Sequence, residues 1–228
     1  DKLDRKWGFI IGDGGGAVCA VILIMSTDGT TILAFSAIAA AFAPSAGEPS
    51  ITSLAGGAVM IHRDAEAGSV EVYDLFSNAP GLGEAPGAID FTGIDIHFPE
   101  GDVIQTFHIG RGAAAVPGTL GGLCAVLRAR GRLELGDILA PVIRYLEEGI
   151  EVQAYQFACF RYVEGILKLS RLGRENFFGE NGNLLEVGGT FSNPVLAGAL
   201  RDLSGHSGEE IDNWLAEKIN RPVLDEFG

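Results

Sequence analysis

The chain has 228 residues and a mean hydropathy of +0.25, with 47% hydrophobic residues, which suits one globular domain over 1–228 with a large core. Thirty acidic residues against sixteen basic ones give a net charge of −14, and no basic stretch is interleaved with aromatic residues. This balance argues against nucleic acids and anionic membranes as partners, and no apolar run reaches the roughly 18 residues of a membrane span. The high apolar content fits either a large permanent interface with another polypeptide or simply an alanine-rich core.

Apolar runs and turn residues define the elements expected in the N-terminal half. The glycine cluster at 12–16 is followed by a strand-like run rather than a helix, so it predicts a flexible turn and not a phosphate-binding loop. Further on, Val70 and Val72 alternate with Glu71 and Tyr73, as in a strand. The expected elements are a buried strand over 17–25, a buried helix over 30–43 that Pro44 stops, strands over 58–62 and 70–76 around a turn at 64–68, and a strand over 103–110.

The stretch over 115–152 carries the most consistent helical pattern. After Gly118, apolar residues recur at helical spacing until Gly131 ends the first helix. A second helix begins near Asp137 and ends at Gly149, a glycine suited to a left-handed stop. Two amphipathic helices joined by a short turn predict an αα-hairpin that lays its apolar face on another element.

The last third predicts three further helices. A Ser-x-x-Glu capping box satisfies the first amides of a helix, and proline is tolerated in a first turn. The expected elements are a helix over 154–172 with Phe157, Phe160, Val163 and Leu167 inward, a loop over 174–182, a helix from Ser192 through Leu203, a helix opened by Ser207 and Glu210 that runs through Ile219 with Trp214 and Leu215 inward, and an unstructured end over 220–228.

Residue types that carry chemistry are not arranged as a site. The four histidines stand far apart without a partner at i+3 or i+4, and adjacent glutamates such as Glu147 and Glu148 belong to exposed helix faces. No serine has the setting of a catalytic nucleophile. The sequence therefore predicts no catalytic residue, no metal site and no cofactor in this chain.

Cys19, Cys124 and Cys159 are widely spaced in apolar surroundings, which predicts buried thiols rather than disulfides. Buried thiols favour a reducing, cytoplasmic compartment. A periplasmic or secreted location stays open, because Lys2 and Arg5 precede an apolar run as in a signal peptide, and the chain does not begin with Met.

Three segments share their order of residues with a known family. They are an alanine-rich run ending in Glu-Pro at 35–49, a Gly-containing loop, hairpin and Ala-Pro end at 48–80, and Ala-Val-Pro-Gly-Thr with two helices at 112–152, with a weaker match over 176–219. In this order the chain resembles the large subunit of the γ-glutamyltranspeptidase family of N-terminal-nucleophile (Ntn) hydrolases. The resemblance implies an α+β fold, a four-layer αββα sandwich completed by a second, small subunit.

In that family a precursor cuts itself before a threonine, which becomes the N-terminal nucleophile of the small (beta) subunit, with its own amine as base. The resemblance implies that this chain is the large subunit of such a processed heterodimer, with the nucleophile on the partner. Gly228 would then be the residue released at self-cleavage, the alternatives being an arbitrary chain end or an unstructured tail. The implied activity is that of an amide-bond hydrolase or acylase on a small-molecule amide through an acyl-enzyme, without a cofactor, and a dimer of heterodimers is allowed.

One departure from the family concerns specificity. Phe76 stands where the family has an arginine that binds the α-carboxylate of a γ-glutamyl group, and a phenyl ring cannot bind a carboxylate. The resemblance then implies an apolar or aromatic acyl group in a pocket lined by Phe76, Ser77 and Asn78. One alternative is a true γ-glutamyl transferase or hydrolase with its anchor at Arg63 or Arg111, and another is a non-catalytic binding or scaffold protein. The segment after the last predicted helix, nine residues, is shorter than the family's usual one.

Overall fold

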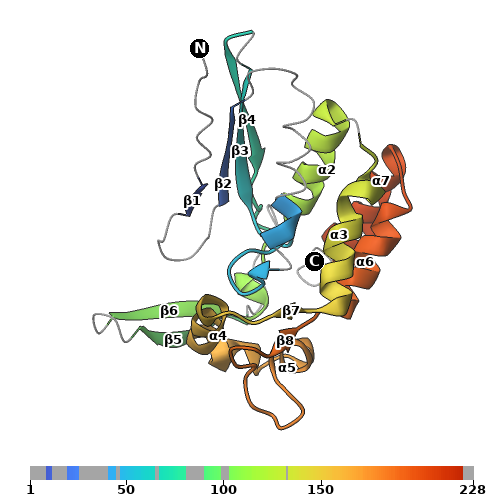
Figure 1. Ribbon diagram of the computed structural model, residues 1–228. Helices are drawn as coiled ribbons and strands as arrows, with labels where there is room; N and C mark the ends of the chain where they lie inside the picture. The colour runs from blue at the N-terminus through green and yellow to red at the C-terminus, as the bar shows by residue number, and fades with distance from the viewer. Residues whose placement is uncertain are drawn as a thin grey trace, which may run out of the picture.

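The computed structural model of the chain describes residues 9–11, 20–25, 41–44, 47–64, 67–80, 90–98, 103–131 and 133–222. These residues form a four-stranded sheet, a group of helices beside it, and a smaller helical lobe from which a two-stranded hairpin protrudes (Figure 1). The mixture of helices and largely antiparallel strands confirms the predicted α+β class.

The four-stranded sheet has the order β1-β2-β3-β4, in which β2 and β3 are parallel and the other neighbours antiparallel. Its strands are β1 (Phe9–Ile11), β2 (Ala20–Met25), β3 (Ala58–Asp64) and β4 (Ser69–Leu75). Strands β3 and β4 form the predicted hairpin, and Gly68 turns the chain at a φ of +66°, which glycine adopts without a steric penalty. The parallel pairing of β2 with β3 requires a crossover, and this crossover includes the helical residues 41–44.

The two faces of the β3–β4 hairpin differ in what covers them. Strand alternation turns Met60 and Leu75 toward the helices, and both side chains are buried. On the other face Val70 and Val72 are 60% and 64% exposed. The alternation predicted over 70–76 is present, but the valines occupy the exposed face and their polar neighbours the covered one. The exposed face of the hairpin, called the open face below, carries the apolar residues Val59, Ile61, Val70 and Val72.

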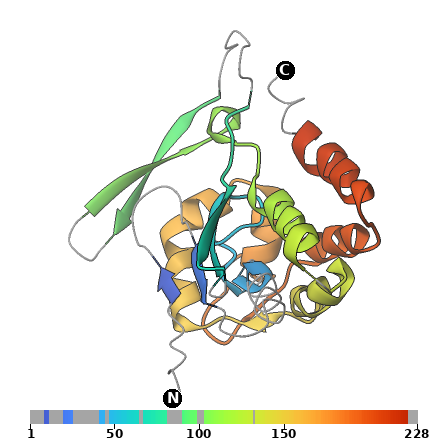
Figure 2. The same ribbon diagram turned by 90° about the horizontal axis from the view of Figure 1, so that it is seen from above.

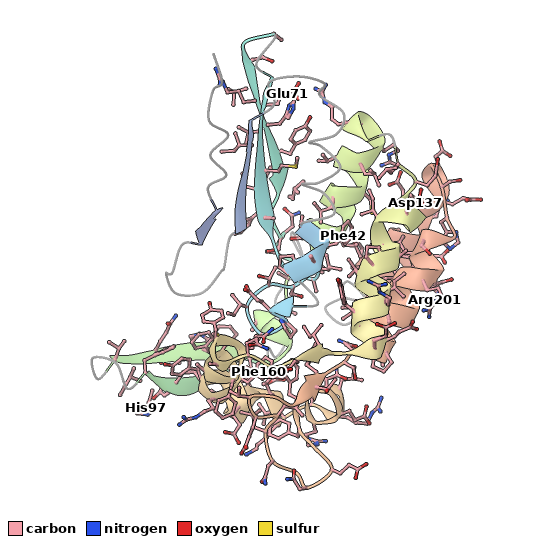
Figure 3. All side chains as sticks on the ribbon, in the orientation of Figure 1. Phe42, Glu71, His97, Asp137, Phe160 and Arg201 are labelled. Carbon is pink, nitrogen blue, oxygen red and sulfur yellow. The ribbon has the colours of Figure 1, made fainter. Side chains whose placement is uncertain are left out.

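Four helices lie beside the sheet and enclose the main core, while the protruding hairpin reaches out on the other side (Figure 2). The helices are α2 (Thr119–Arg130), α3 (Leu135–Glu148), α6 (Pro194–Ser204) and α7 (Glu209–Leu215), which continues into the π-helical η2 (Ala216–Asn220). Phe42 is completely buried in this core, between the sheet and the helices (Figure 3).

Helices α2 and α3 confirm the predicted helices, including the ends at Gly131 and at Gly149, whose φ is +82°. The predicted αα-hairpin is wrong as a packing unit. Helix α2 lies against β4 and α7, whereas α3 lies against α6. The apolar face of each helix packs mainly on elements other than its sequence neighbour, within one shared hydrophobic core.

The smaller lobe has its own hydrophobic cluster. It contains α4 (Ala154–Leu167), α5 (Arg171–Phe177) and the short strands β7 (Ile150–Glu151) and β8 (Thr190–Phe191). Val152, Phe160, Phe177 and Phe191 are its buried residues, and the Phe160 and Phe177 rings meet edge to face with centroids 5.0 Å apart. Phe160 confirms the inward prediction for α4, while Phe157, Val163 and Leu167 are half-buried.

The protruding hairpin consists of β5 (Thr92–Phe98) and β6 (Val103–Ile109), followed by the 3-10 turn η1 (Arg111–Ala113). Strand β6 confirms the strand expected over 103–110, whereas β5 was not predicted, although Ile94, Ile96 and Phe98 alternate with exposed residues as in a strand. Phe98 of β5 contacts Tyr162 of α4, with ring centroids 4.9 Å apart, which holds the hairpin on the lobe.

Several predicted boundaries are wrong. Residues 41–44 and 47 are helical, so Pro44 does not stop the helix; its carbonyl accepts a hydrogen bond from the Glu48 amide at 2.6 Å. The predicted helix over 154–172 is broken, because the Ser170 hydroxyl accepts from the Gly173 amide and starts a new helix, α5, where a loop was expected.

The C-terminal helices also begin and end differently from their predicted bounds. Asn193, not Ser192, caps α6, and α7 starts after Gly208, although the Glu210 carboxylate accepts from the Ser207 amide as a capping box requires. Residues 220–222 are helical rather than unstructured. The predictions for 12–16, 17–19, 30–40 and 223–228 lie outside the described residues.

Candidate functional site

The three residues predicted to line the acyl pocket follow directly after β4. Phe76 is 43% exposed, Ser77 is half-buried and Asn78 is exposed. The Phe76 amide donates to Asp74 Oδ1 at 2.9 Å, which turns the chain out of the strand. Phe76 is therefore the first residue after β4, next to the end of the open face that carries Val70, Val72 and Asp74.

The Ala-Val-Pro-Gly-Thr segment runs beside these three residues. The Asn78 amide donates to the Val116 carbonyl at 3.0 Å, and the Val116 amide donates to the Asn78 carbonyl at 2.8 Å. This antiparallel bridge joins two segments that are about 40 residues apart in the sequence. The two motifs on which the family resemblance rests are therefore in direct contact.

Two glycines allow this close approach. A Cβ at Gly118 would lie 2.1 Å from the Phe76 carbonyl oxygen, and a Cβ at Gly57 would lie 2.7 Å from the Ser77 amide nitrogen. The Gly56 carbonyl also accepts from the amides of Gly118 and Thr119, each at 3.1 Å. The loop before β3, the residues after β4 and the start of α2 thus meet at one point, and glycine is required because backbone lies on backbone.

The sequence singled out these glycines only as part of a motif. Their packing role was not predicted, although a glycine directly before a helix that begins with Thr119 is a signal for it.

Arg63 and Arg111 are the two alternative anchors for a γ-glutamyl carboxylate. Arg63 pairs with Val70, five residues along the strand from the Leu75 end, or roughly 17 Å, so it does not adjoin Phe76. Arg111 lies in η1, five residues before Val116.

A cluster of polar side chains on the covered face joins β4 to the end of α2. Arg130 Nη2 donates to both carboxylate oxygens of Glu71, the residue labelled on the sheet in Figure 3, and the Tyr73 hydroxyl donates to Glu71 Oε2 at 2.8 Å. His62 is buried beside them, with its Nδ1 3.7 Å from Glu71 Oε2. The Tyr73 hydroxyl and the Arg130 guanidinium hold the pKa of Glu71 below its ordinary value of 4.5.

This polar cluster links α2 to the sheet and is not part of the candidate pocket. Glu71 lies four residues before Leu75 on β4, and its carboxylate oxygens already accept hydrogen bonds from Tyr73 and Arg130. We therefore assign it to holding α2 against the sheet.

Cysteine and histidine side chains are the remaining candidates for nucleophile or metal chemistry. Cys124 is buried, and burial raises the pKa of its thiol to about 11, so it is protonated at neutral pH and is not a nucleophile. His97 and His108 lie in the protruding hairpin, apart from the candidate site. Within the described residues there is no group of three metal-ligating side chains, and no helix there is long and apolar enough to cross a membrane.

Of the predicted site residues, the structure describes three and does not describe Gly228. Phe76, Ser77 and Asn78 lie together with Val116 and Gly118, but their contact with a substrate stays a prediction. Gly228 lies outside the described residues, so its release at self-cleavage also stays a prediction.

Comparison with solved structures shows the fold. The chain superposes on gamma-glutamyltranspeptidase from Helicobacter pylori with a TM-score of 0.64 at 19% identity, covering 86% of this chain and 57% of that one. It superposes on cephalosporin acylase from Bacillus halodurans with a TM-score of 0.57 at 21% identity, covering 85% of this chain and 35% of that one.

Comparison of sequences identifies the family. The glutathione hydrolase proenzyme of Bacillus subtilis (strain 168) is 29% identical over 194 residues, and the acylase ACY 1 proenzyme of Pseudomonas sp. (strain SE83) is 32% identical over 124 residues. These alignments cover 85% and 54% of this chain but only 32% and 22% of the two relatives, so the chain spans about a third or less of their length. The family model described as Gamma-glutamyltranspeptidase matches residues 22–224, and the chain therefore belongs to the gamma-glutamyltranspeptidase family.

Proposed function

We propose that this chain is the large-subunit part of an amide-bond hydrolase or acylase that works through an acyl-enzyme. The relatives named as proenzymes support a precursor that is processed, and they include both a glutathione hydrolase and an acylase. The nucleophile is the N-terminal threonine of a small subunit from the same precursor, with its own amine as base.

The exposed apolar residues of the open face are evidence for a second subunit that covers them. Val70 and Val72 are more than half exposed on a strand whose other face is buried, and a sheet with one apolar face left in water is unusual. A second sheet packed on this face would bury the valines together with Val59 and Ile61, and would complete the αββα sandwich. Because Phe76 directly follows β4, it would lie at the edge of that second sheet.

The observation that carries the choice of substrate is Phe76. Its ring is partly exposed at the end of the open face, on a backbone held by Asp74 and Gly118. An aromatic ring binds apolar or aromatic groups and offers no partner to a carboxylate. The proposed substrate is therefore a small amide with an apolar or aromatic acyl group rather than a γ-glutamyl group.

Two other functions remain as alternatives. A γ-glutamyl transferase would need an anchor elsewhere, and of the two arginines considered only Arg111 is close in sequence to the Val116 bridge. A non-catalytic scaffold would keep the fold without a processed threonine.

The deciding experiment combines mass and activity. Intact-mass measurement of the processed full-length protein should show an equimolar second chain that begins with Thr, and its absence would favour the scaffold. The processed protein should hydrolyse phenylacetyl-anilide faster than γ-glutamyl-anilide. Rapid turnover of the γ-glutamyl compound alone would contradict the proposed substrate class.

Replacing Phe76 with arginine tests its place in the pocket. Phe76→Arg should lower kcat/KM for the phenylacetyl substrate by about 10-fold or more, because a buried apolar contact is replaced by a charge. Phe91→Arg, a matched change at a ring that is 53% exposed beside the protruding hairpin, should leave kcat/KM unchanged. Equal kinetics for Phe76→Arg and wild type would remove Phe76 from the pocket.

A further inference from the structure

The direction of the Phe76 side chain depends on two peptide groups, one on either side of its Cα. The amide that precedes this Cα donates to Asp74 Oδ1 at 2.9 Å. The carbonyl that follows it lies against the backbone of Gly118, so closely that a Cβ there would be 2.1 Å from the oxygen. With both peptide planes held, the direction of the Cα–Cβ bond is set before any ligand binds.

The two restraints differ in kind. The carbonyl is held by backbone packing, which no ordinary side-chain change removes without disturbing the fold. The amide is held by a single side chain, and Asp74 itself is exposed on the open face, where its Cα pairs with Val59. Asp74 is therefore the one side chain of the described residues that is bonded to the Phe76 amide.

Resting on the proposed function, we propose that Asp74 is a positioning residue for acyl-group specificity. Its carboxylate fixes the turn that presents the Phe76 ring, and it does not contact the substrate itself. Removing the acceptor releases the Phe76 amide, and the ring then samples directions that do not match an aromatic acyl group. Substrates too small to reach the ring are unaffected.

Two substitutions separate positioning from direct binding. Asp74→Asn keeps an oxygen that can accept from the Phe76 amide but removes the charge, whereas Asp74→Ala removes the acceptor. If Asp74 positions Phe76, the kcat/KM for an aromatic acyl substrate should fall in Asp74→Ala and stay at the wild-type value in Asp74→Asn. If the carboxylate instead bound a charged group of the substrate, asparagine and alanine would be equally impaired.

The test uses the processed full-length protein with phenylacetyl-anilide and acetyl-anilide. Asp74→Ala should lower kcat/KM for the phenylacetyl substrate by about fivefold, mainly through KM, since one hydrogen bond is lost. It should leave the acetyl substrate within about twofold of wild type. Asp74→Asn should behave as wild type on both substrates. The matched control, Asp95→Ala in β5, removes an exposed carboxylate bonded to the Thr106 hydroxyl at 2.6 Å and should change neither rate.

A second measurement follows the hydrogen bond directly. Hydrogen exchange of the Phe76 amide should be slow in wild type and Asp74→Asn and faster in Asp74→Ala, at unchanged melting temperature. Equal losses on both substrates, failure of asparagine to restore the rate, or unchanged selectivity would overturn the positioning role alone. A processed wild-type protein that hydrolyses neither anilide would overturn the proposed function and this inference with it.

Discussion

Gly118 shows how a single residue sets the geometry of the candidate site. It has no room for a side chain, because a Cβ would lie 2.1 Å from the Phe76 carbonyl oxygen and 2.5 Å from that of Leu75. Both obstacles are backbone atoms, which cannot rotate away as a side chain would. The start of α2 and the end of β4 must therefore separate if any side chain is added here.

Gly118→Ala should lower the free energy of unfolding by about 2–3 kcal/mol, the cost of forcing two backbones apart. Urea denaturation followed by circular dichroism measures the loss. Gly198→Ala is the matched control: Gly198 is exposed within α6 and its Cβ would meet nothing within 4 Å, so stability should rise by about 0.5–1 kcal/mol. Equal behaviour of the two variants would contradict the close approach.

Glu71 gives the molecule an acid-sensitive contact. Tyr73 and Arg130 hold its pKa below 4.5, so the charged form is favoured in the folded state. A carboxyl group with a lowered folded pKa contributes stability above its unfolded pKa, and this contribution is lost as the pH falls through the folded pKa. The stabilisation is therefore complete above the ordinary pKa of 4.5 and is lost as the pH falls through the lower pKa of the folded state, where Glu71 gains its proton.

Glu71→Gln should accordingly be less stable than wild type at neutral pH, and the deficit should shrink as the pH falls below 4.5. Denaturant midpoints of both proteins across this range check the prediction. Arg130→Met should show the same convergence, because it removes the other half of the ion pair. A deficit that does not depend on pH would show that packing, not charge, is what the substitution changes.

At the scale of elements, the start of α6 shows that a nearby sequence can indicate a helix end without identifying the residue that caps it. Asn193 caps α6 through its side chain, which accepts from the Leu196 amide at 3.0 Å. The predicted start was Ser192, since serine and asparagine are both good caps and only the backbone conformation shows which of the two accepts from the first amides of the helix.

Asn193→Ala should destabilise the protein by about 1 kcal/mol, the usual effect of losing a side-chain cap. Ser192→Ala, one residue earlier, should have a clearly smaller effect. Thermal unfolding of the two variants compares them directly. A larger loss for Ser192→Ala would return the cap to the position predicted from the sequence.

On the scale of the whole molecule, the open face is the feature that a single chain leaves unexplained. Val70 and Val72 lie in water while the polar Glu71 and Tyr73 between them are turned toward α2. This inverts the usual placement for an isolated antiparallel hairpin, and it fits a sheet that is covered on both faces in the complete protein.

Val72→Lys should leave the stability of this chain nearly unchanged but should weaken its association with the rest of the precursor, by about 10-fold or more. Gel filtration of the processed protein, with the fraction of paired chains measured, checks this. Val195→Lys is the control, because Val195 is 57% exposed on α6 and lies outside the open face. Loss of pairing in both variants, or in neither, would argue against the open face as the interface.

Local chemistry explains which parts of the fold could be predicted. Gly131 and Gly149 end helices α2 and α3, and alternation with Gly68 at the turn specifies the β3–β4 hairpin, because each signal acts within a few residues. Strand β5 was not predicted although its apolar residues alternate, and its full-length pairing with β6 shows it clearly. The break between α4 and α5 was not predicted, because the apolar residues Leu167, Leu169 and Leu172 continue across it.

By itself the sequence determined the α+β class, the positions of the main helices and the family, because these depend on periodicity and on the order of motifs. Only the tertiary structure decided which face of β4 is covered, that α2 and α3 have different main neighbours, and that Phe76, Val116 and Gly118 meet. These are contacts between residues far apart in the chain, and their geometry depends on how whole surfaces pack. The substitution at Phe76 was visible in the sequence, whereas the frame that holds it became visible only in three dimensions.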